Sequence, residues 1–229
     1  MEFEQIQEEV KKLHVELWTH KESLWPDKSI TPIEMLEPEV AAHVLGVEYV
    51  EMPNLGDPRF GYRGQHLKIA GSIDRGLNRI SVSTEFKHNT VRFTGAHEVG
   101  HWVLHPDQVM HRDLPVEGLT TKHRNRKEKE ADYYAACYLM PSRLLGDMFS
   151  KLFCTTIPLA IDETVAFHLN PQDPQSLLLA DDESLERELA VARCESFGTQ
   201  RFNSLAKIFR VSDLAMAIRI KELKLIRWP

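Results

Sequence analysis

Residues 91–105 read Val-Arg-Phe-Thr-Gly-Ala-His-Glu-Val-Gly-His-Trp-Val-Leu-His. Apolar and small residues occupy almost every side of this segment, a pattern typical of a helix buried in a core. His97 and His101 are four positions apart, so they lie on one face of such a helix with Cβ atoms roughly 5–6 Å apart. We therefore predict a buried helix over about residues 91–105 that presents two imidazoles on one side.

The pentapeptide at residues 97–101 has the HExxH pattern of zinc hydrolases. Its spacing lets both imidazoles reach one ion at about 2 Å, and Glu98 can act on a water there without being a ligand. Two histidines and a carboxylate are costly to bury unless something binds them. The alternative is a pair of ordinary helix histidines bonded to backbone or solvent. The pattern favours a metallopeptidase with His97 and His101 as metal ligands and Glu98 as the catalytic base.

A catalytic zinc site needs a third protein ligand and an open position for water. The metzincin pattern would require glycine at position 104 and a ligand at position 107. Asp107 is present, but Leu104 replaces the glycine, so this option is poor. His105 follows His101 by one more helical turn, too far from His97 to share an ion with both, and we interpret it as a surface or pocket-wall residue.

A second predicted helix, over residues 126–141, is the better source of the third ligand. Along one stripe of this helix the residues change from acidic to apolar. The stripe consists of Glu128, Asp132, Ala135 and Leu139. We predict that Glu128 is the third metal ligand and that Asp132 accepts the second ring N–H of a ligand histidine, fixing its tautomer. Glu130 points away from this stripe and is the less favoured ligand. The alternative for Glu128 is a solvated carboxylate between two lysines.

These segments resemble the ImmA/IrrE family of zinc peptidases. Residues 93–105 are similar to the family segment RFTLAHELGHWLLH, and residues 128–141 to its E-x-E-A-N-x-F-A-A-x-L-L-M-P helix. Residues 70–82 resemble the hairpin ahead of the metal helix, and residues 205–226 resemble the usual C-terminal helical stretch. Residues 151–198 match no segment of that family.

The resemblance implies a gluzincin-like site that holds Zn²⁺, with Mn²⁺ or another divalent ion as the alternative. It also implies a narrow protein substrate, typically a helix-turn-helix transcriptional repressor whose cleavage releases stress, phage or mobile-element genes. The chain departs from the family pattern at Gly95, where leucine is common, and at Asp132, where asparagine is common. Aspartate at this position also suits gluzincins generally.

The composition of the chain limits its compartment and partners. It has 229 residues, no run of 18 apolar residues and an acidic N-terminus, which predicts neither a membrane span nor a secretory signal. Its three cysteines, Cys137, Cys154 and Cys194, indicate a reducing cytoplasm rather than a disulfide framework. The net charge of −6 argues against nonspecific nucleic-acid binding by the whole chain.

Charge is uneven near the C-terminus. Residues 173–195 hold seven acids and two bases, whereas residues 199–229 hold seven bases and two acids. The basic end can contact phosphates or pair with the acidic helix before it, and the closeness in sequence favours pairing. Residues 204–209 and 213–222, with Ser212 as N-cap, have helix-turn-helix spacing. A helical hairpin packed on the rest is favoured over a DNA reader, which remains open.

We predict an α+β fold with a zincin-like catalytic domain, in which a small antiparallel sheet packs on helices, plus a C-terminal helical, helix-turn-helix-like region. The expected parts are a peptidase domain over 1–150, an acidic helical linker region over 151–198 and the C-terminal segment 199–229. The expected elements of the first part are an amphipathic helix (2–19), a short helix (38–46), a strand (47–52), a hairpin (67–73 and 78–83), the metal helix, a long loop (106–125), the second helix and a helix over 142–150.

The predicted reaction is attack of water on a peptide carbonyl, with Glu98 moving the proton to the leaving amine. The sequence does not choose among the candidates for the second oxyanion donor, which are Tyr133, Tyr134, His123 and Arg124. The strand at 78–83 is a candidate edge for aligning an extended substrate. The rival is a non-hydrolytic, metal-stabilised regulator that sequesters a repressor or binds DNA through residues 203–226.

Overall fold

The computed structural model describes residues 2–26, 29–55, 68–107, 110–113 and 125–227. The chain divides into two compact units, residues 1–139 and residues 140–229. This division differs from the three predicted parts, because the boundary comes before residue 150 and everything after it forms one unit. Among the helices of the described ranges, none has the length and apolar character needed to cross a bilayer.

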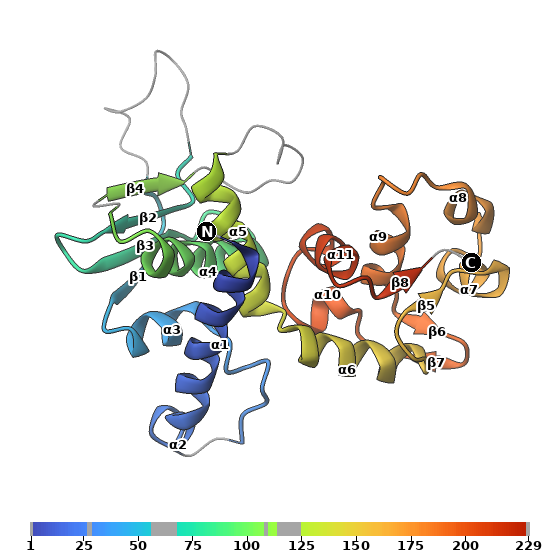
Figure 1. The fold of residues 1–229 in the computed structure, drawn as a ribbon, viewed down its shortest axis with the longest axis horizontal. Helices are drawn as coiled ribbons and strands as arrows, with labels where there is room; N and C mark the ends of the chain where they lie inside the picture. Colours follow the sequence, from blue (N-terminus) through green and yellow to red (C-terminus); the bar gives the residue numbers. More distant parts are fainter. Residues whose placement is uncertain (1, 27–28, 56–67, 108–109, 114–124, 228–229) are drawn as a thin grey trace, which may run out of the picture. The chain divides into compact units, whose positions relative to one another are not determined.

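The first unit alternates helices with short strands (Figure 1). Its elements are α1 (Phe3–Thr19), α2 (Lys21–Leu24), α3 (Pro38–Val44), β1 (Glu48–Met52), β2 (Gly71–Asp74), β3 (Arg79–Ser83), α4 (His88–Leu104), β4 (Met110–Asp113) and α5 (Arg126–Leu139).

The four strands form one sheet in the order β1-β3-β2-β4. Strands β2 and β3 pair antiparallel as the predicted hairpin, whereas β1 pairs parallel with β3. The predicted antiparallel sheet is therefore a mixed one. Strand β4 lies inside the segment 106–125 that was predicted as a loop, because β2 offers it an edge to pair with. The prediction of residues 78–83 as a substrate-binding edge was wrong, since β3 is paired on both sides.

Helix α4 packs on the sheet and on α5, and α5 packs on α1 (Figure 1). The buried positions of α1 are Ile6, Val10, Leu13 and Leu17, the stripe expected of an amphipathic helix. Gly100 allows α4 and α5 to approach closely, because a Cβ at this position would lie 3.1 Å from the Tyr134 side chain. Two helices that carry polar side chains thus meet in the core of the unit.

The second unit contains six helices within the described residues and two short strand pairs. The elements are α6 (Ser142–Phe153), β5 (Leu159–Ala160), α7 (Glu163–Leu169), α8 (Pro174–Leu179), α9 (Glu186–Arg193), β6 (Ser196–Phe197), β7 (Gln200–Arg201), α10 (Leu205–Ile208), α11 (Asp213–Glu222) and β8 (Ile226–Arg227). Ser212 caps α11 by accepting the N–H of Ala215, as predicted. Helix α10 is only a single short turn before α11.

Several basic side chains of this second unit have intramolecular partners. Lys207 pairs with Glu195, and Lys221 donates to the backbone carbonyls of Asp182 and Ser184. Arg219 is buried and donates to Glu222. Of these contacts, the ion pair between Lys207 and Glu195 is of the predicted kind, because it joins a base of the C-terminal end to an acid of the region before it.

Candidate metal centre

Helix α4 places the two histidines of the pentapeptide together in the interior. His97 is 1 % exposed and His101 is fully buried, and their Nε2 atoms are 3.0 Å apart. The pairing follows from the i, i+4 spacing, and burial follows from contacts on both sides of α4, with the sheet and with α5. Nε2 of each ring therefore points to the same location.

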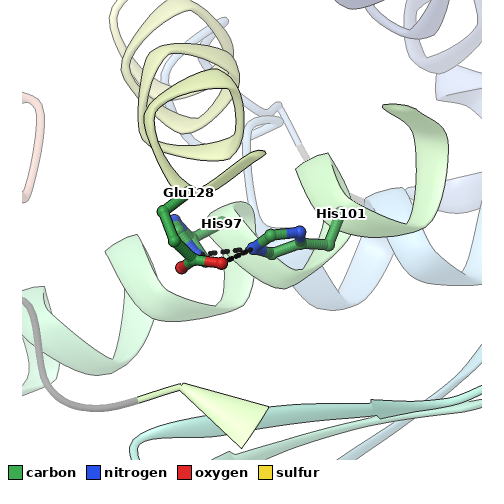
Figure 2. Close-up of side chains that lie close together, drawn as sticks. All are labelled: His97, His101 and Glu128. Atoms are coloured by element: carbon green, nitrogen blue, oxygen red, sulfur yellow. Dashed lines mark hydrogen bonds and ion pairs between the residues drawn. The ribbon is translucent and has the colours of Figure 1, made fainter. Parts of the chain in front are cut away.

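Helix α5 brings the carboxylate of Glu128 to that point (Figure 2). One oxygen lies 3.5 Å from Nε2 of His97 and the other lies 3.5 Å from Nε2 of His101. Bonds of about 2.0–2.1 Å in a tetrahedral site separate ligand atoms by about 3.3 Å, so these distances fit a zinc site. Two imidazoles and a carboxylate are also a usual zinc ligand set. The structure thus brings together the three predicted ligands.

The first turn of α5 is held in place by its own cap. Asn125 accepts the backbone N–H of Glu128 at 3.0 Å, which satisfies one of the donors that a helix N-terminus leaves without an intrahelical acceptor. This bond fixes the turn on which Glu128 sits.

Asp132 lies one turn after Glu128, and its Oδ1 is 2.9 Å from Nδ1 of His97. This nitrogen is on the opposite side of the ring from the one that faces Glu128. A carboxylate at this position favours the tautomer with the proton on Nδ1, which leaves Nε2 open for a metal ion. The predicted role of Asp132 is therefore supported for His97.

Glu98 points from α4 toward the sheet. It is fully buried, and its carboxylate occupies space next to Gly71 of β2. A Cβ at position 71 would lie 2.2 Å from Oε1 of Glu98 and 2.7 Å from Cγ2 of Thr94. The absent side chain at Gly71 is what makes room for this carboxylate between α4 and β2.

The interpretation of His105 as a surface or pocket-wall residue was wrong. It is 4 % exposed, and its Nδ1 lies 2.9 Å from Nδ1 of His101. Its Nε2 lies 3.0 Å from Glu130, which also accepts a hydrogen bond from Arg126. The sequence analysis did not predict the contact of His105 with His101 and Glu130, although the i, i+4 spacing of His101 and His105 was a signal for part of it.

Glu130 is buried near this histidine chain. Burial alone would raise its pKa, yet hydrogen bonds, among them those from His105 and Arg126, lower the pKa of Glu130 to about 2. The carboxylate is therefore charged at neutral pH and acts as an acceptor.

The structure adds little support for any candidate for the second oxyanion donor. The Tyr133 hydroxyl accepts a hydrogen bond from Gln7 of α1 at 2.6 Å. The Tyr134 side chain lies against Gly100 and is fully buried. Both side chains are thus engaged with neighbouring helices. His123 and Arg124 lie outside the described residues.

Comparison with known protein families gives a match over part of the chain. Residues 62–170 match a peptidase family described as the IrrE N-terminal-like domain. The matched range includes α4 and α5, with every residue brought together at the candidate metal centre. A search of curated proteins found no match to this sequence.

Proposed function

We propose that this chain, which carries an IrrE N-terminal-like peptidase domain over residues 62–170, is a cytoplasmic zinc-dependent endopeptidase. The supporting observation is the convergence of His97, His101 and Glu128, and Glu98, which follows His97 on α4, is fully buried. Zn²⁺ is the favoured ion because the donors number three and their spacing suits a tetrahedron. Mn²⁺ or another divalent ion is the alternative.

The side chains of this centre have separate roles. His97, His101 and Glu128 would hold the ion, which supplies a Lewis acid that lowers the pKa of water and polarises a carbonyl. Glu98 takes the proton from the attacking water and delivers it to the leaving amine. Its burial next to Gly71 keeps this carboxylate in one position, as proton transfer between fixed partners requires.

The proposed substrate is a helix-turn-helix transcriptional repressor, and the support for this comes from the family resemblance. An extended substrate segment would pair with an outer strand of the sheet. In the described sheet the outer strands are β1 and β4, so one of these takes the role first considered for residues 78–83.

The test is the Glu98→Gln variant, assayed against a peptide library made from the proteome of the source organism. The wild type should create new peptide termini and Glu98→Gln should create none, because a neutral amide cannot accept the proton. Zinc content should be equal in both. Equal cleavage by the variant would contradict the proposed base.

The rival function, sequestration without hydrolysis, predicts a different outcome. A regulator of this kind would relieve repression as well in the Glu98→Gln variant as in the wild type, since its effect needs binding alone. A reporter gene under the cognate repressor distinguishes the two functions.

DNA binding through residues 203–226 is tested separately. DNA binding predicts a salt-dependent affinity for DNA that falls when exposed basic side chains of the protein are neutralised. Arg210 and Lys224 are suitable because both are exposed, whereas neutralising the buried Arg219 would also disturb packing. Unchanged affinity in Arg210→Gln and Lys224→Gln would remove the DNA-binding function.

A further inference from the structure

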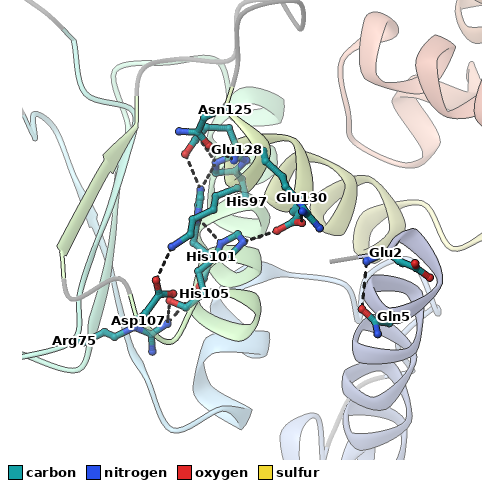
Figure 3. A network of polar contacts seen from close by, with 12 residues as sticks. Glu2, Gln5, Arg75, His97, His101, His105, Asp107, Asn125, Glu128 and Glu130 are labelled. Atoms are coloured by element: carbon teal, nitrogen blue, oxygen red, sulfur yellow. Dashed lines mark hydrogen bonds and ion pairs between the residues drawn. The ribbon is translucent and has the colours of Figure 1, made fainter.

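A row of polar contacts leads away from the candidate metal centre (Figure 3). It begins at His101, whose Nδ1 lies 2.9 Å from Nδ1 of His105. It continues from Nε2 of His105 to Oε2 of Glu130 at 3.0 Å, and from Oε1 of Glu130 to Nε of Arg126 at 2.9 Å. His101, His105 and Glu130 are each less than 10 % exposed.

The protons in this row can be assigned from the metal outwards. An ion on Nε2 of His101 leaves the proton of that ring on Nδ1, which must then donate. Nδ1 of His105 must accept, so the proton of His105 is on Nε2, where Glu130 accepts it. Glu130 accepts from His105 on one oxygen while Arg126 donates to the other, so this arrangement gives every donor in the row an acceptor.

The two metal-binding histidines are thus supported in different ways from one helix. His97 has the carboxylate of Asp132 directly on its Nδ1. Nδ1 of His101 instead faces Nδ1 of His105, and His105 connects it to Glu130. The sequence of α5 therefore supplies a ligand, Glu128, and a carboxylate for each imidazole.

Arg75 holds the end of α4, where His105 lies. Arg75 donates to the backbone carbonyls of His101, Trp102 and His105, and its guanidinium lies 4.2 Å from the centre of the Trp102 ring. These contacts fix the last turn of α4, so the His105 ring has little freedom to leave Glu130.

We propose that His105 and Glu130 are positioning residues, which hold His101 in the ring orientation and tautomer that bind the metal ion. This inference rests on the proposed metal site. It assigns a task to two buried residues that take no direct part in the proposed hydrolysis.

The experiment measures the zinc dissociation constant by competition with a chromogenic chelator. His105→Leu should weaken zinc binding by roughly 10–100-fold, the range typical of residues that orient metal ligands. Glu130→Leu should weaken it in the same direction. His105→Asn and Glu130→Gln should recover part of the loss, because each keeps an acceptor at the required place.

Asp107→Asn is the matched control. Asp107 follows the end of α4 and pairs with Lys127 of α5 at 2.7 Å, so it also joins the two helices but lies outside the row of contacts. Its loss should leave the zinc dissociation constant unchanged. Circular dichroism of every metal-free variant checks that the helices are intact.

Three outcomes separate the two proposals. A wild type that binds no zinc contradicts the proposed function. A wild type that binds zinc, with both leucine variants within about twofold of it, contradicts only the positioning roles. If a leucine variant fails to fold, ¹⁵N NMR of the zinc-loaded wild type determines the tautomer of His105. A proton on Nδ1 of His105 contradicts the inference. A proton on Nε2 alone supports it.

Discussion

At the scale of single residues, Gly71 and Glu98 pack closely against each other at the candidate site. The carboxylate of Glu98 occupies the position where any other residue at 71 would place its Cβ. A glycine on β2 and a glutamate on α4 are therefore matched in shape, and the match determines where the proposed base lies. Neither periodicity nor motif spacing contains this information.

Gly71→Ala should reduce peptide cleavage by about 100-fold, the effect typical of a catalytic group misplaced by about 1 Å, while zinc binding stays intact. The added methyl group displaces Glu98, and the three atoms nearest to it belong to Glu98 and Thr94 rather than to a metal ligand. Overpacking of this kind also costs about 1–3 kcal/mol of stability. Peptide-library cleavage and zinc content of the purified variant give the two readouts.

Gly76→Ala is the control for this variant, because a Cβ at Gly76 would meet only Asp74 Oδ1 at 3.2 Å. It should cleave at the wild-type rate. Wild-type cleavage by Gly71→Ala as well would show that the position of Glu98 is not critical.

At the scale of elements, α1 supports α5 through a histidine. His14 of α1 lies with Nε2 3.0 Å from the backbone carbonyl of Tyr138 on α5. Burial lowers the pKa of His14 below its ordinary 6.5, so the neutral ring is the form that suits the folded state. As the pH falls through about 6.5, the unfolded chain takes up this proton before the folded chain does.

The free energy of unfolding should therefore fall between pH 7.5 and pH 5.5, and His14→Gln should make that fall smaller. Glutamine keeps an N–H donor for Tyr138 but does not titrate. Urea unfolding at several pH values measures the difference between the two proteins. A pH dependence as steep in His14→Gln as in the wild type would mean that other groups cause it.

The elements of the first unit could largely be predicted from sequence. Helices α1 and α5 follow from their apolar stripes, α4 follows from apolar and small residues on almost every side, and the β2–β3 hairpin follows from its turn. Strand β4 could not be predicted, because its residues Met-His-Arg-Asp have no strand pattern and it exists through pairing with β2. The parallel pairing of β1 is also nonlocal, so no local pattern indicates it.

The residues of the candidate site likewise divide into those that the sequence predicted and those that it did not. His97, Glu98 and His101 follow from one pentapeptide, and Glu128 and Asp132 follow from one helical stripe. The contact between His105 and Glu130 depends on how α4 and α5 pack against each other, and sequence spacing does not specify that angle.

At the scale of the whole molecule, the chain forms two units whose boundary lies between α5 and α6. Charge suggested a third part, with an acidic stretch before a basic one. In the structure these stretches belong to one unit, because α9 packs on α10 and α11. Exposed ion pairs between Arg193 and Asp213 and between Lys207 and Glu195 also connect them, although exposed pairs add little stability.

Removing the metal ion should destabilise the first unit selectively. A ligand that binds only the folded state adds stability that is lost when it is withdrawn. Hydrogen exchange with and without a chelator should show faster exchange in α4 and α5, and little change in α9 and α11. An equal change in both pairs of helices would contradict a metal site confined to residues 97–128.

The central claim is that three side chains from α4 and α5 bind one divalent ion. It is tested most directly by the zinc content of the purified protein, measured by native mass spectrometry. We predict one zinc ion per chain in the wild type and in Glu98→Gln, and loss of that ion in His101→Ala and Glu128→Ala. Full zinc occupancy in Glu128→Ala, or none in the wild type, would contradict it.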